Sequence, residues 1–185
     1  MPTTDVLEAL AKEPVRALLI ALRYGPLDYD SVASIASGGT SDAALKHLVR
    51  LHAIRVERLA RRSSYELTTY GRDMLAAVDF AGGLPGGVAI FHILYCSGGR
   101  QVLVQHMGYL VRDLHRFPDS TRATVTRRLR DAGAITQARP PQVIDAEGHR
   151  VLLVMLHLLA RRRHEELAAQ AWEDASALRF EPPPP

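Results

Sequence analysis

Two separate stretches of this chain gather positive charge. Residues 42–72 hold seven Lys or Arg residues against three acidic ones, and residues 112–139 hold seven Arg residues against three, so each stretch carries +4. Residues 1–30 and 145–185 each carry −2. Cationic side chains gathered on one surface neutralise the phosphates of nucleic acid. The charge distribution therefore predicts phosphate-binding surfaces, with a solvated charged helix face as the alternative.

The two basic stretches share a sequence pattern. SDAALKHLVRLHAI (residues 41–54) aligns with RATVTRRLRDAGAI (residues 122–135) at an offset of 81 residues, and LTTYGRDML (67–75) aligns with IDAEGHRVL (144–152) at an offset of 77. In each copy a helix ends in Ala-Ile, a short polar stretch follows, and a hydrophobic residue and a Gly lead into a new helix. Two blocks in the same order at nearly the same offset indicate an internal repeat. This order is typical of a winged helix-turn-helix, so two such units are expected in tandem.

Helix signals surround the basic residues of the first unit. A helix is expected around residues 15–24, and Asp30 is expected to cap a short second helix. Thr40 or Ser41 caps a third helix near residues 41–52, whose apolar residues recur at helical spacing and face inward. These inward residues are Ala44, Leu45, Leu48 and Leu51.

A two-stranded wing is expected after the third helix. A hydrophobic strand leads from about residue 56 to a polar tip at residues 61–64, and a second strand returns through residues 65–67. Thr68 or Thr69 then caps a fourth helix.

Residues 81–87 (AGGLPGG) hold four Gly and one Pro, which makes this segment the best candidate for a domain boundary. The predicted units are therefore residues 1–82 and residues 83–178, with residues 179–185 as a disordered Pro-rich tail.

The second unit is expected to follow the plan of the first. VAIFHILYC (residues 88–96) and residues 100–116 are expected to form helices, and a second recognition helix is expected near residues 121–132. Pro140-Pro141 cannot donate ladder hydrogen bonds, which limits the second wing to an edge or a loop.

The last helix is expected to start near Gly148 and to reach Leu178. It carries more apolar surface than a small domain needs, so two copies are expected to pair across a two-fold axis and form a homodimer. In the alternative, the helix folds back over its own domain. The apolar residues in question are Val151, Leu152, Met155, Leu156, Leu159, Leu167, Ala171, Trp172 and Leu178.

A helix fits the major groove of double-stranded DNA and presents its side chains to base edges, where Arg and Lys suit guanine. The predicted contacts of the first unit are Ser41, Lys46, His47 and Arg50 on the helix and Arg61 and Arg62 at the wing tip, with Asp42 as a helix cap. The predicted contacts of the second unit are Thr121, Arg122, Thr124, Arg127 and Arg128. Arg127-Arg128 falls at the positions of Lys46-His47, which supports the analogy between the units.

RRSSYELTTYGRDML (residues 61–75) resembles the wing and following helix of bacterial winged-helix regulators of the MarR, PadR and HxlR kind. The residues that carry this resemblance are Tyr65, Leu67, Thr68, Gly71 and Leu75. STRATVTRRLRDAGAI (residues 120–135) resembles the recognition helix of many such regulators. The resemblance implies a transcriptional regulator that reads the major groove of DNA, with wing contacts to the backbone or minor groove. The chain departs from the pattern by carrying two units, and its second unit lacks the Tyr-x-Leu-Thr strand.

Three other classes of function remain as alternatives. Tandem winged helices also serve as protein-interaction modules in chromosome segregation and assembly, although such modules are often acidic. His92 and Cys96 lie four residues apart, as in a metal- or redox-responsive regulator, but two ligands make an incomplete site and core packing is the simpler explanation. No nucleophile elbow, phosphate loop or zinc-protease motif is present, so no enzyme activity, metal or cofactor is expected.

The composition limits the kind of core and the cellular compartment that we expect for this chain. Hydrophobic residues make up 47% of the chain and aromatic residues only 6%, which predicts an aliphatic core. No apolar run reaches the ~20 residues that a membrane helix needs. The absence of a visible signal peptide and the single Cys favour a cytoplasmic protein. The Arg-, Ala- and Pro-rich composition is compatible with a high-GC bacterium.

Overall fold

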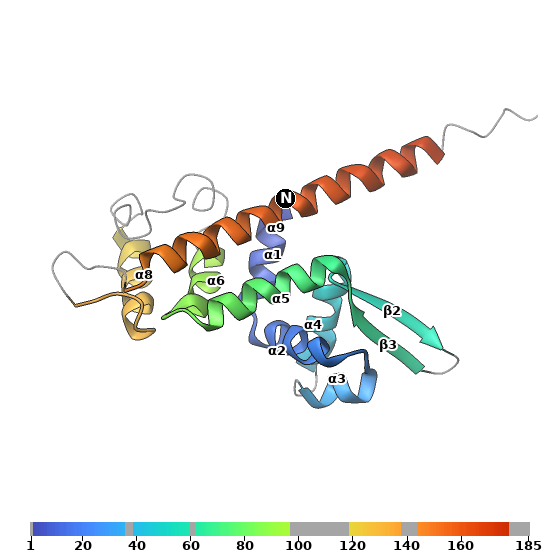
Figure 1. Ribbon diagram of the computed structural model, residues 1–185, viewed down its shortest axis with the longest axis horizontal. Helices are drawn as coiled ribbons and strands as arrows, with labels where there is room; N and C mark the ends of the chain where they lie inside the picture. Colours follow the sequence, from blue (N-terminus) through green and yellow to red (C-terminus); the bar gives the residue numbers. More distant parts are fainter. Residues whose placement is uncertain (1, 36–38, 60–61, 97–118, 138–143, 178–185) are drawn as a thin grey trace, which may run out of the picture.

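The computed structural model describes residues 2–35, 39–59, 62–96, 119–137 and 144–177. These residues are mainly helical and include one small three-stranded antiparallel sheet, which confirms the predicted α+β class (Figure 1). The helix predicted at residues 100–116, Pro140-Pro141 and the tail lie outside the described residues. The elements are α1 (Pro2–Ala11), α2 (Glu13–Ala21), the 3-10 helix η1 (Leu22–Tyr24), β1 (Leu27–Asp28), α3 (Tyr29–Ile35), α4 (Gly39–Arg50), β2 (Ile54–Leu59), β3 (Arg62–Leu67), α5 (Thr69–Gly82), α6 (Gly87–Cys96), α8 (Asp119–Asp131) and α9 (Ala146–Ala177).

The sheet consists of a hairpin and one added short strand. β2 and β3 pair antiparallel, with Ile54 opposite Leu67, which confirms the predicted hairpin. β1 pairs with the other edge of β3, so the strand order is β1-β3-β2. β3 begins at Arg62, opposite Leu59, so Arg62 and the two serines after it belong to a strand and not to the tip. The hairpin projects from the helical body (Figure 1).

The ends of α4 and α8 share one backbone geometry. After α4, His52 has a left-handed φ of 53°, and after α8, Gly133 has a φ of 69°. The next residue, Ala53 or Ala134, donates its N–H to the carbonyl five residues earlier, at 2.9 and 2.8 Å. A left-handed residue with this hydrogen bond satisfies carbonyls that the last helical turn leaves open. The repeated Ala-Ile pair therefore marks a repeated helix end.

The starts of α5 and α9 also match. The N–H of Gly71 donates to the Thr68 side chain at 3.0 Å, and the N–H of Gly148 donates to the Asp145 carboxylate at 2.9 Å. Each cap satisfies one open N–H of a first helical turn. In both copies a backbone N–H just ahead of the helix also bonds to the Ala carbonyl at the preceding helix end, at 3.0 and 2.9 Å. The sequence repeat therefore corresponds to a repeat of backbone geometry.

Replacing Thr68 by Ala is expected to lower the free energy of unfolding by about 1–2 kcal/mol. The Thr68 hydroxyl accepts the N–H of Gly71 and donates to the carbonyl of His52 at 2.7 Å, so it joins α5 to the end of α4. Thr69→Ala is the control, because Thr69 is exposed and should change stability by less than ~0.5 kcal/mol. Urea unfolding measures both variants, and equal stability of the two would contradict the prediction.

One hydrophobic core runs through both halves of the chain. The sequence predictions contain no helix at α1, yet α1 buries Val6, Leu7 and Leu10 and packs against α4, α6 and α9. α5 in turn packs along α6 and α9. The buried residues from Val6 to Leu159 form a single cluster. The two predicted units are therefore joined by packing, and their boundary stays a prediction.

The predicted long last helix is present as α9, and its first half lies on the body of the molecule. Leu152, Leu156 and Leu159 are buried. The hydroxyl of Tyr70 on α5 donates to the carbonyl of Leu159 at 3.1 Å. These residues therefore belong to the chain's own core, as in the alternative in which the helix folds back. The second half of α9 extends beyond the other elements (Figure 1).

α3 is capped by a different residue from the one predicted. Asp28 accepts the N–H of Ser31 at 2.9 Å, and hydrogen bonds from Ser31 lower the pKa of Asp28. Asp30 lies inside the helix, because α3 already begins at Tyr29. The prediction of Asp30 as the cap was therefore wrong by two residues.

Within the described residues, no single helix has both the length and the apolar character needed to cross a membrane. α5 and α6 meet that requirement only as a pair, which is bent by 117° at its break.

Candidate nucleic-acid interface

The solvent face of α4 is only weakly positive. Lys46 and Arg50 are exposed, as predicted. Asp42 is also exposed, and its carboxylate accepts a hydrogen bond from the Tyr29 hydroxyl at 3.0 Å. Val49 is 43% exposed. α4 therefore offers two cations together with a carboxylate and an apolar side chain.

Ser41 does not belong to this face. Its residue is only 1% exposed, in the first half of α4. Its position near the start of the helix made it a candidate, but the helix turns its side chain inward. We therefore leave Ser41 out of the proposed contact surface.

His47 is held between α4 and α1. Its side chain is 13% exposed, with the Lys12 amine 2.6 Å from Nε2 and the Arg50 guanidinium 3.1 Å from Nδ1. Lys and Arg only donate, so both ring nitrogens face cationic donors. Burial is the main cause that lowers the pKa of His47, and the charge of Lys12 lowers it further. A neutral imidazole can accept from only one of these two donors, because its other ring nitrogen carries the N–H. His47 is thus enclosed by Lys12 and Arg50 and is not open to a DNA base.

Two carboxylates of α1 lie beside the cations at the end of α4. The Glu8 carboxylate is 2.8 Å from the Lys12 amine and 3.7 Å from Nε2 of His47. The Asp5 carboxylate is 3.9 Å from the Arg50 guanidinium. The hydrogen bond from Lys12 is the main cause that lowers the pKa of Glu8, so Glu8 is ionised at neutral pH. Any phosphate that approaches this end of α4 must compete with α1.

The free energy of unfolding is expected to fall as the pH drops from about 7.5 to about 5.5. The pKa of His47 in the folded chain lies below its ordinary value of 6.5, so the unfolded chain binds that proton more readily. Stability is fully present above 6.5 and is lost as the pH falls toward the lower folded pKa. His92 acts in the same direction, because burial lowers its pKa too.

Urea unfolding at pH ~7.5 and at pH ~5.5 measures this loss of stability. The carboxylates with lowered pKa do not titrate between these two values. A double variant, His47→Gln with His92→Gln, should lose clearly less stability between the two values than the wild type. An equal loss in both proteins would assign the pH dependence to other groups.

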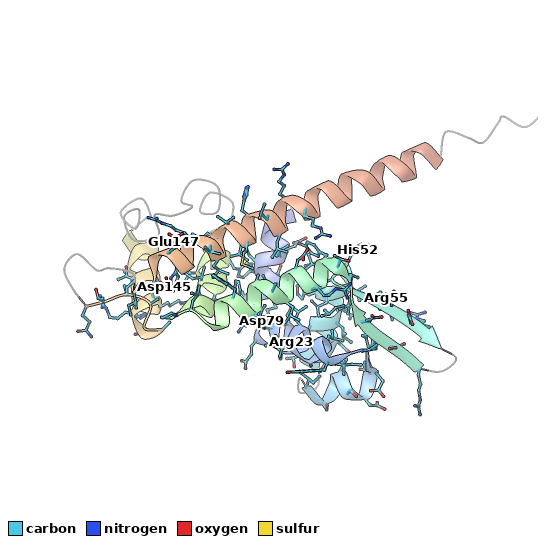
Figure 2. The ribbon with its side chains drawn as sticks, viewed as in Figure 1. Arg23, His52, Arg55, Asp79, Asp145 and Glu147 are labelled. Atoms are coloured by element: carbon cyan, nitrogen blue, oxygen red, sulfur yellow. The ribbon has the colours of Figure 1, made fainter. Side chains whose placement is uncertain are left out.

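The hairpin adds two exposed cations. Arg58 on β2 and Arg62 on β3 are both exposed. Arg55, which is labelled in Figure 2, is instead paired: its Nε donates to the Glu66 carboxylate at 2.9 Å, and its guanidinium lies 3.6 Å from Glu57. Arg61 lies outside the described residues. The described part of the hairpin therefore offers Arg58 and Arg62 to a partner.

α8 carries more positive charge than α4 over the whole helix, although its exposed Asp131 lies one turn after Arg127 on the same side. Arg127 and Arg130 are both exposed, and residues three apart lie on one side of a helix. α8 holds four Arg against two Asp, whereas α4 holds one Lys and one Arg against one Asp. α8 and the hairpin lie at opposite ends of the molecule in Figure 1. The two predicted DNA-reading regions are therefore well separated.

The other predicted residues of α8 are less accessible or are not described. Arg128 and Thr124 are half-buried. Arg128 lies near α6, since its charge adds to the effect of burial in lowering the pKa of His92. The side chains of Thr121 and Arg122 lie outside the described residues.

The described residues contain no group of three or more His, Cys, Asp or Glu side chains that could hold a metal ion. His92 is half-buried on α6, and the side chain of Cys96 is not described. His149 is buried near the start of α9, and its Nε2 has no hydrogen-bond partner within the part of the chain that is described. One such nitrogen does not make a metal site.

Two exposed cations of this surface, Arg58 and Arg130, were missed by the sequence predictions. Arg130 follows Arg127 by three residues, so helical spacing alone would have placed both on one face. Arg58 lies within the predicted strand, but charge alone does not show which residues of a strand face a partner.

No protein-family model, curated protein or solved structure matches this chain.

Proposed function

We propose that the chain is a DNA-binding transcriptional regulator built from two winged helix-turn-helix units. In the first unit, support comes from the order α2, β1, α3, α4 and hairpin, and from the pairing of β1 with the second strand of that hairpin. In this arrangement α4 is the helix that enters the major groove, and the hairpin is the wing that contacts the backbone or minor groove. In the second unit, support comes from the helix end after α8 and the matching cap before α9.

The arginine face of α8 is the observation that carries this proposal. At the repeat offset of 81 residues, Arg127 takes the place of Lys46, and Arg130 takes the place of Val49. All four residues are exposed, so the repeat presents equivalent positions to solvent. Arg suits both phosphate and guanine. α8 is therefore the stronger DNA-contacting helix, and α4 with the wing is the weaker one. The proposed contacts are Lys46, Arg50, Arg58, Arg61, Arg62, Arg122, Arg127 and Arg130.

Selection from a random library of duplex DNA tests whether the chain reads sequence. The full chain is incubated with the library, and the recovered duplexes are sequenced after several rounds. The proposal expects an enriched motif, since a base-edge contact discriminates by about 1–3 kcal/mol. Recovery without any motif would limit the function to phosphate binding, and no recovery would contradict DNA binding.

A protein-interaction module is the second candidate. The face of α4 favours it, because Val49 is exposed there beside Asp42. Tyr24, at the end of η1, is 84% exposed and adds further uncovered aromatic surface. Failure of the library selection to recover any DNA would favour the protein-interaction module.

Removing the α1 carboxylates is expected to strengthen DNA binding. In a variant with Asp5→Asn and Glu8→Gln, the ion pair between Arg50 and Asp5 is absent. Arg50 can then bind a DNA phosphate without first breaking that ion pair. Because an exposed ion pair is worth ~0.2–1 kcal/mol, we expect affinity for duplex DNA to rise by roughly 1.4- to fivefold. Fluorescence anisotropy with a labelled duplex measures the change.

A variant with Glu13→Gln and Asp79→Asn is the matched control, because it changes the net charge equally at two exposed residues away from α4. An equal gain in both variants would mean that net charge, and not the position of α1, controls affinity.

A further inference from the structure

The solvent side of α9 carries a stripe of uncovered apolar side chains. Val151 is 39% exposed, Val154 is 41% exposed and Leu158 is 56% exposed. Their spacing of three and four residues places them on one side of the helix. They lie opposite the buried Leu152 and Leu156, which belong to the chain's own core. We refer to Val151, Val154 and Leu158 as the α9 stripe.

A cavity between α5 and α9 adjoins the stripe. Its volume is about 260 Å³, and Leu158 forms part of both the cavity wall and the stripe. The side chains that line it are Asp73, Ala76, Met155, Leu158, Leu159 and Arg162. At its rim Arg162 donates to the Asp73 carboxylate. The apolar surface is therefore a shallow groove with room for side chains of another helix.

The two ends of the α9 stripe carry opposite charges. Glu147, labelled at the start of α9 in Figure 2, has a side chain that is 78% exposed. Beyond the other end of the stripe come Arg161, which is exposed, and Arg162, whose side chain is 43% exposed. Asp145 and Glu147 precede the stripe together with one cation, Arg150, which lies 3.5 Å from the Glu147 carboxylate, so this end keeps a net charge of −1 while the other end is positive.

We propose that a second copy of this chain covers the stripe, with the two α9 helices antiparallel about a two-fold axis near Val154. In this register Val151 of each copy lies opposite Leu158 of the other, and Glu147 lies opposite the Arg161–Arg162 pair. A two-fold interface uses the same patch on both subunits, so the patch must complement itself. A parallel arrangement would place like charges opposite each other, which is why the charges select the antiparallel one.

The antiparallel pair also brings the projecting half of each α9 into contact with the other copy. In this arrangement the second half of each α9 runs past the first turn of the other copy's α9. The contact surface differs from the apolar set predicted from the sequence, because Leu152, Leu156 and Leu159 are already buried within one chain. The proposal goes beyond DNA binding and does not depend on it.

The oligomeric state of the full chain in solution tests the proposal without any DNA. Sedimentation equilibrium at about 5–100 µM should show a dimer of the 20.4 kDa chain. Leu158→Glu should shift it to monomer, with the dissociation constant raised at least tenfold. Ile20→Glu is the matched control, because Ile20 on α2 is 40% exposed and lies outside the stripe. Circular dichroism checks that both variants are folded.

A charge exchange tests the antiparallel register. Glu147→Arg and Arg161→Glu should each weaken the dimer, and the double variant should restore it. A wild type that is monomeric at 100 µM would overturn the proposal, and so would a Leu158→Glu variant that remains a dimer. Failure of the double variant to restore the dimer would overturn the antiparallel register. Because no DNA is present, none of these results bears on the proposed DNA binding.

Discussion

Replacing Arg127 and Arg130 together by Glu is expected to weaken the binding of duplex DNA on the order of 100-fold at ~50 mM salt. Both residues are exposed on one side of α8, so the change should not disturb the core. A unit charge ~4 Å from a phosphate is worth about 1 kcal/mol at the dielectric constant of water, so a shift of four units corresponds to at most about 4 kcal/mol, which screening by ~50 mM salt reduces toward ~3 kcal/mol. The slope of log affinity against log salt should also fall by about two, one for each lost phosphate contact.

The control for this experiment is Arg23→Glu with Arg150→Glu, which changes the net charge by the same amount. Arg23 pairs with Asp79 of α5 (Figure 2), and Arg150 pairs with Glu147. These arginines lie outside the proposed contact surface, so the control should keep the salt slope of the wild type. Equal losses of affinity and slope in both variants would show that total charge matters and that α8 has no special role.

Replacing Gly71 by Ala is expected to lower the free energy of unfolding by about 3 kcal/mol or more. A Cβ atom at Gly71 would lie 1.9 Å from the carbonyl oxygen of Ala53. That oxygen cannot easily move, because it accepts the backbone N–H of Thr68 at 3.0 Å. The absence of a side chain at Gly71 is therefore what lets α5 start against the end of α4. The expected fall in melting temperature is about 6–12 °C.

Gly82→Ala is the matched control, since a Cβ there would meet nothing within 4 Å. We expect it to be neutral or to stabilise the fold by up to ~1 kcal/mol. The equivalent residue of the repeat, Gly148, should give a smaller loss than Gly71, because its Cβ would meet the flexible end of the Leu84 side chain at 2.4 Å. A Gly71→Ala variant as stable as Gly82→Ala would contradict the close approach of Gly71 to the carbonyl of Ala53.

The parts of the fold that the sequence predicted well are those set by local patterns. The hairpin follows from alternation and its polar tip, and the start of α5 follows from Thr68 and Gly71. The long helix α9 was predicted almost to its ends because its apolar residues recur without a Gly or Pro after Gly148. These elements could be predicted because they depend on interactions between residues that are close in the sequence.

Of two features that the sequence predictions missed, one had a local signal and the other depends on a contact between distant residues. α1 has Val6, Leu7 and Leu10 at helical spacing, a signal that was present but not used. Its contact with α4 could not be predicted, because Lys12 and His47 are 35 residues apart and meet only through packing. Because of this contact, His47, which was expected to contact a DNA base, instead lies largely buried beside Lys12.

The proposed function requires that this chain bind double-stranded DNA through phosphate contacts. The most direct test is fluorescence anisotropy of a labelled random duplex, titrated with the full chain at several salt concentrations. We predict binding at ~50 mM salt and a steep linear fall of log affinity against log salt, as counterion release requires. Absence of binding at ~50 mM salt, or binding that does not change with salt, would contradict the claim.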